Sequence, residues 1–346
     1  MPFNLIIRTD AGADLGTDPA TRALALACAA RDAGQLPHVV GRFADIPWFA
    51  ERLQQENIPL TELDDAPQSR ATPEKLLHDI RLGGDPPPGE SWVALDGGHF
   101  TSDCQQALMR AGYWLLVIDE HCNRAYCCDL LLNANLGAET MPYIGQIGYM
   151  LLGPKYALLP EEFAAARAAP PRRRKQADGI LVALGRENSP ERLGEIARGM
   201  LHPGMAGYPV RIFSENLPEQ HVRQSFEGCL ASVEVFSDPA KMIGLVQSAV
   251  LSVVHGDLCW GLCSLGAPFL TVEAPQTHRN YISNALTEKG LAEPYSPQAF
   301  QRLLFDAAAR ERMSKGLREL ADAQGAARVV RGLEVCLENP LAAAEA

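Results

Sequence analysis

Titratable side chains follow apolar runs at several points of this 346-residue chain. Asp96 ends one such run, and His99 comes three residues later. His255 ends another and is followed by Gly256 and Asp257. A histidine can transfer protons near neutral pH, and a flexible glycine lets backbone N–H groups approach an anion. The spacing indicates proton transfer or sugar binding at His99 and phosphate binding at His255, although each histidine also suits a structural role.

A parallel sheet is the element that would position these side chains. Strand-like apolar runs alternate with helical patterns along the chain, which is typical of a parallel sheet covered by helices. Such sheets bind ligands beyond the carboxyl ends of their strands. The predicted strands are 5–8, 37–41, 92–96, 113–119 and 130–133 in the first half, and 180–184, 210–213, 232–236, 249–254 and 268–272 in the second.

The α/β alternation restarts at Gly179, which predicts a second domain. The chain exceeds the length at which one core usually stops growing. Segment 164–178 combines a proline pair with four consecutive basic residues, which is typical of a linker. We therefore expect two Rossmann-like domains, at 1–163 and 179–338, facing a ligand-binding cleft, with a linker at 164–178 and a frayed tail at 339–346.

Composition narrows the functional classes. The net charge is -11 and long basic runs are missing, which argues against nucleic acid as a partner. No signal peptide or membrane span of about 20 residues is recognisable, so a cytoplasmic protein is expected. We also expect a monomer or a weak homo-oligomer. The chain lacks a nucleophile elbow, a Walker loop and a complete Gly-x-Gly-x-x-Gly, which argues against serine hydrolases, NTPases and dehydrogenases.

Cysteine spacing predicts neither disulfides nor a metal site. The nine cysteines are irregularly spaced, and most lie in apolar or helical contexts, as reduced core thiols do. His121 and three cysteines gather within 121–128, but common zinc sites use well-separated Cys pairs. No metal and no cofactor are therefore expected. A divalent cation such as Mg²⁺ would be needed only if Asp257 faced a diphosphate.

Five stretches resemble the UDP-sugar hydrolase family of pseudaminic acid biosynthesis. They are RTDAGADLGTDPATR at 8–22, VIDEHCNR at 117–124, CDLLLNAN at 128–135, LGPKYALL at 152–159 with the following Glu-Phe at 162–163, and WGLCSLGAP at 260–268. The resemblance implies a two-domain GT-B-type fold, related to the transferase that makes lipid II. It also implies that water attacks the anomeric carbon of a UDP-linked 2,4-diacetamido-2,4,6-trideoxyhexose and releases UDP.

The resemblance assigns catalysis to the first domain. The family's first loop reads Gly-x-Gly-His-x-x-Arg, with the His over the sugar. Gly16 and Arg22 keep this pattern, but Asp18 and Pro19 replace the second Gly and the His. Pro19 cannot move a proton, so the catalytic candidates are Asp18, Arg22 and His99. Asp18 equally suits a helix N-cap, where backbone N–H donors would lower its pKa and weaken it as a base. 

Two further residues of the first domain are substrate-binding candidates. Asp96 stands where the family has an Asp-x-Tyr turn, and Tyr156 lies within the specific LGPKYALL stretch.

The nucleotide side departs further from the family. Its Gly-Gly-Ser-Thr-x-Trp-Glu pattern appears here as HGDLCWG, which keeps Trp260 but puts Gly261 at the ribose-binding Glu. Losing that carboxylate should remove roughly 1.5 to 3 kcal/mol of binding. Arg186 suits either a phosphate contact or an ion pair with Glu187. The nucleotide-binding candidates are Gly185, Arg186, His255, Gly256, Asp257 and Gln276.

Three functions remain open on sequence grounds. The first is a nucleotide-sugar hydrolase with a rearranged site. The second is a glycosyltransferase that uses an acceptor alcohol instead of water. The third is a non-catalytic relative that binds a sugar nucleotide, a glycan or a protein. Fold alone does not choose among them, because function resides in the site.

Overall fold

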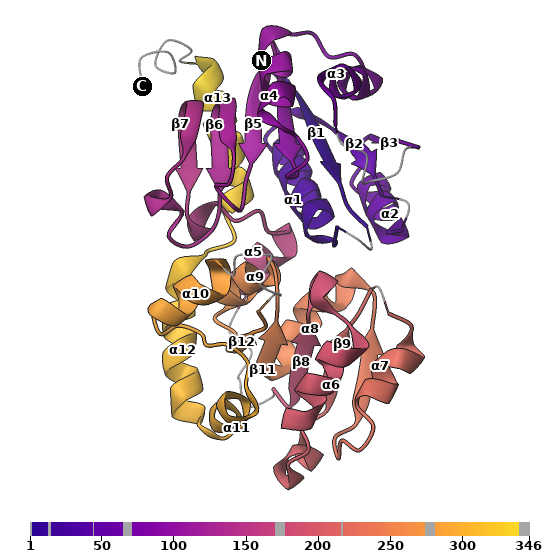
Figure 1. Ribbon diagram of the computed structural model, residues 1–346, viewed down its shortest axis with the longest axis vertical. Helices are drawn as coiled ribbons and strands as arrows, with labels where there is room; N and C mark the ends of the chain where they lie inside the picture. Colours follow the sequence, from indigo (N-terminus) through magenta and orange to yellow (C-terminus); the bar gives the residue numbers. More distant parts are fainter. Residues whose placement is uncertain are drawn as a thin grey trace. The chain divides into compact units, whose positions relative to one another are not determined.

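The computed structural model describes residues 2–12, 15–43, 45–64, 71–169, 177–215, 217–273 and 281–338. The chain forms two compact units (Figure 1). The first contains Met1–Glu161 and the segment from Gln324, and the second contains Glu162–Ala323.

Within the described residues, the first unit holds a seven-stranded parallel sheet with the order β3-β2-β1-β4-β5-β6-β7. The strands are β1 (Asn4–Asp10), β2 (Leu36–Arg42), β3 (Leu60–Glu62), β4 (Ser91–Asp96), β5 (Trp114–Ile118), β6 (Ala125–Asn133) and β7 (Ile144–Leu152). Strand order places the carboxyl ends of β1, β4 and β5 next to one another, which is where the predicted first-domain site should form.

Apolar side chains cover both faces of this sheet, because successive strand residues point to opposite sides. Leu5 and Ile7 face one core cluster, whereas Ile6 faces another. The first cluster packs against α1 (Asp18–Asp32), α2 (Pro47–Gln55) and α13 (Gly325–Glu338). The second packs against α3 (Pro73–Leu82) and α4 (Ser102–Arg110). Two-sided burial explains why the sequence shows continuous apolar runs here.

Strands β3 and β7 were not predicted. β3 is short, and β7 is an edge strand whose first three residues are exposed, so neither shows a buried apolar run. Two glycines in β7 lie against β6: an added Cβ would lie 2.0 Å from the carbonyl oxygen of Tyr126 at Gly145, and 2.5 Å from that of Asp129 at Gly148. Glycines inside a strand pattern mark such close backbone approaches, and this signal was available in the sequence.

The C-terminal helix α13 belongs to the first unit and not, as expected, to the second. Val329 and Leu333 are fully buried in the core cluster that α1 also covers. Figure 1 shows this yellow helix beside β6 among the elements of the first unit. Amphipathic periodicity finds such a helix but does not tell which sheet its apolar face covers.

The second unit holds a five-stranded parallel sheet, in the part that the structure describes, with the order β10-β9-β8-β11-β12. Its strands are β8 (Gly179–Ala183), β9 (Val210–Phe213), β10 (Val233–Phe236), β11 (Ala249–Val254) and β12 (Phe269–Thr271). All five match predicted strands. The α-helices are α5 (Glu161–Ala168), α6 (Pro190–Gly199), α7 (Glu219–Ser225), α8 (Met242–Ser248), α9 (Leu258–Leu265), α10 (Tyr281–Glu288), α11 (Pro297–Phe305) and α12 (Ala307–Leu320).

Helix α5 occupies part of the segment that was expected to be a linker. Arg167 Nη1 donates hydrogen bonds to the carbonyl oxygens of Ser264 at 2.5 Å, Ala321 at 3.0 Å and Arg318 at 3.1 Å. These bonds anchor α5 to the ends of α9 and α12. The chain therefore passes into the second unit before the Pro- and Arg-rich stretch, of which residues 170–176 lie outside the described residues.

The structure also bears on membrane spans and cysteines. No helix among the described residues is both long and apolar enough to cross a membrane. All nine cysteines lie in described segments as free thiols, and six of them are buried.

Candidate functional site

A network of charged side chains lies at the carboxyl edge of the first sheet. Its centre is Asp10, the last residue of β1, whose side chain is 1% exposed. Arg8 Nη1 lies 2.6 Å from Asp10 Oδ1, and Arg42 Nη1 lies 3.1 Å from both carboxylate oxygens. Arg8 Nε also contacts Asp79 Oδ2 at 3.2 Å. Buried charges need partners of this kind, since desolvating an unpaired ion is expensive.

The surroundings of Asp10 keep it ionised. Burial by itself raises the pKa of Asp10, but the hydrogen bond to His99 and the two neighbouring guanidinium groups outweigh burial and hold this pKa well below its usual value. Asp10 is thus a permanent carboxylate near neutral pH. Sequence reasoning missed it because a polar residue ending a strand is common, although the pattern Arg8-Thr-Asp10 after an apolar run was a signal.

His99 lies against this carboxylate, with Nε2 3.0 Å from Asp10 Oδ2. Its side chain is 24% exposed, and its ring packs on Phe100 at 4.0 Å between centroids. A Cβ added at Gly97 would lie 2.6 Å from His99 Cε1 and 2.9 Å from Nδ1, so the ring occupies space that only glycine leaves. An ionised carboxylate at Nε2 favours a proton there, which leaves Nδ1 as the basic nitrogen of the neutral ring.

Arg22 is shared between two carboxylates. Its Nε and Nη2 bind the oxygens of Asp96 at 2.7 and 2.9 Å, and its Nη1 binds Glu120 Oε1 at 2.9 Å. Burial raises the pKa of Asp96, against the opposing charge of Arg22. The structure thus brings three predicted residues, Arg22, Asp96 and His99, to one edge of one sheet. It adds Asp10 and Glu120, which were not predicted.

The first loop places Asp18 differently from the expected N-cap. Thr17 is the N-cap of α1, and Asp18 is the first helical residue, followed by Pro19. Pro suits the first turn of a helix because the N–H group that it lacks would have no intrahelical partner there. The N-cap is therefore one residue earlier than expected, at Thr17. Asp18 therefore lies in the first turn, where its charge favours the helix dipole. Gly16 has φ 83° and exchanges backbone hydrogen bonds with Gly12 at 3.1 and 2.7 Å, which closes the loop tightly.

Tyr156 lies apart from the charged network. It ends a short 3-10 helix, η2 (Pro154–Tyr156), which follows β7 at the far side of the sheet. Its ring packs against the first core cluster, and Lys155 Nζ lies 5.0 Å from the ring centroid. The geometry indicates a packing role for Tyr156.

In the second unit, His255 follows β11 and precedes the N-terminus of α9. Its Nδ1 lies 2.8 Å from the carbonyl oxygen of Val272. Because a carbonyl only accepts, Nδ1 carries the proton. Gly256 has φ 78°, and Asp257 is the N-cap of α9 but makes no capping hydrogen bond with its side chain. The structure thus groups three predicted nucleotide residues where backbone N–H groups and the helix dipole attract anions.

The loop after β8 contains the other predicted nucleotide residues. Gly185 is exposed, has φ 53°, and begins the 3-10 helix η4 (Gly185–Glu187). The side chain of Arg186 and all of Gln276 lie outside the described residues. Asn188, which sequence reasoning did not single out, is buried, and its Nδ2 donates to Ser214 Oγ at 2.7 Å. This bond ties together the ends of β8 and β9.

Gly261 has a clear packing reason. A Cβ added at this position would lie 2.4 Å from Cε1 of Phe163 on α5. The family's ribose-binding Glu therefore cannot stand here while Phe163 keeps its place. Any ribose contact in this protein must come from other residues.

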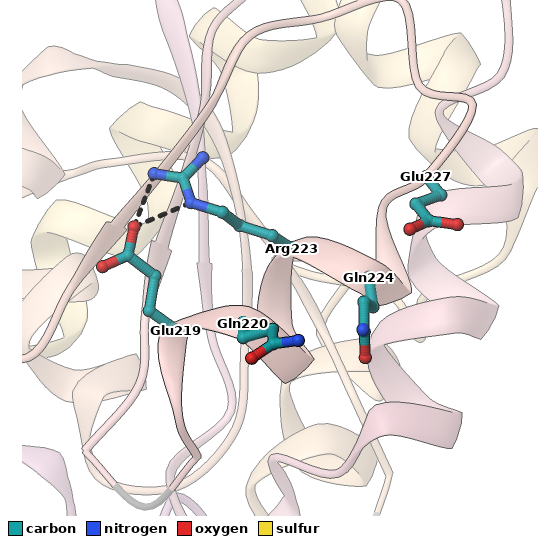
Figure 2. Close-up of a pocket in the computed structure, with 5 residues that line it drawn as sticks. All are labelled: Glu219, Gln220, Arg223, Gln224 and Glu227. Atoms are coloured by element: carbon teal, nitrogen blue, oxygen red, sulfur yellow. Dashed lines mark hydrogen bonds and ion pairs between the residues drawn. The ribbon is translucent and has the colours of Figure 1, made fainter.

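A pocket of the second unit does not coincide with the strand ends. Figure 2 shows a pocket formed by α7 and the residues that follow it, lined by Glu219, Gln220, Arg223, Gln224 and Glu227. Glu219 Oε1 and Arg223 Nη2 lie 2.7 Å apart, so these two charges of the pocket neutralise each other.

Among the described residues, no group of three or more His, Cys, Asp and Glu side chains is arranged to hold a metal ion.

Comparison with known proteins relates the chain to solved structures only. No protein-family model matches it. No curated protein sequence matches it either. MurG from Acinetobacter baumannii is 16% identical with a TM-score of 0.63, covering 96% of this chain and 99% of that one. S. aureus MnaA, in a structure with UDP, is 13% identical with a TM-score of 0.69 and 97% coverage of both chains. CalG4, the calicheamicin glycosyltransferase, is 15% identical with a TM-score of 0.57, covering 98% of this chain and 99% of that one.

These likenesses define the fold class. Both parallel sheets with their covering helices match glycosyltransferase and epimerase structures along nearly the whole chain. The protein has a GT-B-type fold built of two Rossmann-like domains, as the sequence predicted.

Proposed function

We propose that this protein processes a nucleotide-linked sugar, and that it releases UDP from a UDP-linked diacetamido-trideoxyhexose by transferring the sugar to water. We place this reaction in the biosynthesis of nonulosonic acids for surface or flagellin glycans, as the five family-like stretches imply. The observation that carries the proposal is His99 held on the ionised Asp10 at the carboxyl edge of the first sheet. A base oriented by a buried carboxylate is the arrangement that general acid–base catalysis requires.

In this reaction, the bond between the anomeric carbon and the phosphate oxygen breaks, and a bond from that carbon to the water oxygen forms. The basic Nδ1 of His99 takes a proton from the attacking water. Asp10 stabilises the resulting imidazolium through Nε2, as a carboxylate does for a catalytic histidine. The proton then passes to solvent.

His255 and the N-terminus of α9 are the proposed site for the departing diphosphate. Nδ1 donates its proton to the Val272 carbonyl oxygen, so Nε2 is the ring nitrogen that we assign to the ligand. When protonated, this nitrogen donates a charge-assisted hydrogen bond to a phosphate oxygen. S. aureus MnaA in a structure with UDP, and UDP-GlcNAc 2-epimerase from Neisseria meningitidis with UDP-GlcNAc, share this fold, which supports nucleotide binding as part of the proposal.

Two alternatives make different demands on the same residues. A GT-B-type glycosyltransferase is equally consistent with the fold, and in it His99 would deprotonate an acceptor alcohol. A catalytically inactive relative would bind its ligand without turnover. Pro19 at the family's histidine position and the packed Gly261 favour this last alternative.

The test is UDP release from UDP-N-acetylglucosamine and from the UDP-linked diacetamido-trideoxyhexose, in water alone. We expect release by the wild type, and a loss of about 10²- to 10⁴-fold in kcat for His99→Ala. His78→Ala, which changes an exposed histidine of α3, serves as the matched control. Release that appears only after an acceptor alcohol is added would favour the transferase, and an unchanged rate in His99→Ala would overturn the role of His99.

A further inference from the structure

A half-exposed carboxylate stands on the outer side of the charged network. Glu120 follows β5, and its side chain is 41% exposed, whereas those of Arg22 and Asp96 are 9% and 4% exposed. The network thus runs from a buried anchor, Asp96, through Arg22, to an acid that faces solvent. The charge of Asp96 interacts with both Glu120 and His99, so all three lie around one end of the sheet.

The Glu120 carboxylate is held in place by a fixed partner. Two of the donors of Arg22 are committed to Asp96 in a bidentate pair, which fixes the guanidinium plane. The third group, Nη1, points at Glu120 Oε1. An exposed long side chain normally samples many rotamers, but this one is tethered to a rigid, buried cation.

The backbone of Glu120 is held as well. Asn135 Nδ2 donates to the Glu120 carbonyl oxygen at 2.8 Å, and Asn133 Oδ1 accepts from the Asn135 N–H at 3.0 Å. In the same turn, Asp119 Oδ2 accepts from the N–H groups of His121 and Cys122 at 3.0 and 2.8 Å. Residues from two strand ends therefore position one acid.

Stability gives little reason for this arrangement. The Arg22–Glu120 pair is only partly buried, and Arg22 already has Asp96 as its buried partner, so the pair with Glu120 adds little to the stability of the fold. A fixed acid at the ligand-binding edge of the sheet is, by contrast, what a binding site needs. Its chemistry is that of a hydrogen-bond acceptor, since an ionised carboxylate accepts only, at up to about four positions.

The surrounding charge restricts the ligand. Around Glu120, the guanidinium groups of Arg22 and Arg124 already pair with the carboxylates of Asp96 and Asp119. These cations are therefore committed to carboxylates, and the negative charge of Glu120 itself disfavours a phosphate while it attracts neutral hydrogen-bond donors. We propose that Glu120 binds the sugar part of the ligand, accepting hydrogen bonds from hydroxyl or acetamido N–H groups. This inference rests on the proposed sugar-processing function and names a specificity-determining residue for it.

The experiment measures sugar binding without its nucleotide. Saturation-transfer NMR of the full chain with N-acetylglucosamine gives an apparent Kd for the wild type, Glu120→Ala and Glu120→Gln. We expect Glu120→Ala to weaken binding at least about tenfold, because a hydrogen bond to a charged group is lost. Glu120→Gln should show an intermediate effect, because its amide oxygen still accepts. Glu51→Gln, an exposed acid of α2 in the same domain, should bind as the wild type does.

Calorimetric titration with UDP separates this inference from the proposed function. If UDP fails to bind while sugar binding still depends on Glu120, the nucleotide-sugar function falls and the sugar contact stands. If UDP binds but the Glu120 variants bind N-acetylglucosamine like the wild type, or if the wild type does not bind it, the Glu120 contact is wrong. Circular dichroism melting of each variant shows whether a loss reflects unfolding.

Discussion

Asp10 is the residue on which the first-domain network depends, because two buried guanidinium groups and His99 all contact its carboxylate. Removing this charge takes one carboxylate partner from each of two buried guanidinium groups. Loss of one partner of a buried ion pair typically costs about 3 to 5 kcal/mol. We expect Asp10→Asn to destabilise the first domain by about that amount in urea unfolding near pH 7.

The same carboxylate makes stability depend on pH in a defined direction. The pKa of Asp10 is lowered by folding from an unfolded value of about 3.9. The contribution of Asp10 to the free energy of unfolding is therefore complete above about pH 4. This contribution is lost as the pH falls toward the lower pKa of the folded state. Urea unfolding between pH 2 and 6 should show this loss in the wild type and in the exposed control Asp103→Asn, but much less of it in Asp10→Asn. Parallel curves for wild type and Asp10→Asn would contradict the assignment.

The residues of the candidate site were predicted where the side chain followed an apolar run or, as with Arg22, matched a motif of the resembled family. Asp96 and His99 follow an apolar run and a glycine pair, and the structure places both at the sheet edge. Asp10 and Glu120 were missed because their partners are distant in sequence. His99 lies 89 residues from Asp10 and Arg22 lies 98 residues from Glu120, and only the fold brings these pairs together. Asp18 was misjudged by one position, because Pro19 suits either of the first two helical positions.

At the scale of elements, helices α5 and α9 of the second domain pack through a glycine. Gly261 lies in α9, and an added Cβ would meet the ring of Phe163 at 2.4 Å. We expect Gly261→Ala to destabilise the second domain by about 1 to 3 kcal/mol, which is typical of overpacking. Gly194→Ala in α6 is the matched control, since nothing lies within 4 Å of its added Cβ. That change should stabilise by about 0.5 to 1 kcal/mol through helix propensity.

Thermal unfolding followed by hydrogen exchange distinguishes the two glycines. A lower stability of Gly261→Ala and a higher stability of Gly194→Ala, each relative to the wild type, would support the packing of α5 on α9. A stabilising Gly261→Ala would show that Phe163 is displaced at little cost, and the position would then be open to larger side chains.

Helix α13 provides a second test of how elements are assigned to domains. Leu333 is fully buried in the first-domain core, whereas Val335 on the same helix is 37% exposed. We expect Leu333→Ala to cost about 2 to 5 kcal/mol, and Val335→Ala to change stability by less than about 0.5 kcal/mol. Hydrogen exchange should rise in β1 and α1 of the Leu333 variant. A rise confined to α11 and α12 would place α13 with the second domain instead.

The sequence predicted elements better than it predicted their partners. All five strands of the second sheet were found, because each is a short apolar run between helical patterns. Short or exposed strands, such as β3 and β7, lack that pattern. The Pro- and Arg-rich stretch marked a boundary only approximately, because the contacts of Arg167 that draw α5 into the second unit leave no local signature.

At the scale of the whole molecule, two Rossmann-like domains of the GT-B type were predicted by the restart of the α/β alternation and are found in the structure. The first domain carries the oriented histidine and the fixed acid, and the second carries a histidine at a helix N-terminus. Each half therefore has its own proposed role, with sugar chemistry in the first and nucleotide binding in the second.

Hydrolysis and transfer both require that the protein binds a nucleotide. Calorimetric titration of the purified protein with UDP, with CMP, GDP and ADP as controls and with and without Mg²⁺, tests it directly. The expected result is selective micromolar binding of UDP, weakened about tenfold by His255→Ala through loss of one charge-assisted hydrogen bond. Binding of none of the four nucleotides, with or without Mg²⁺, would contradict the claim and leave only a non-catalytic relative.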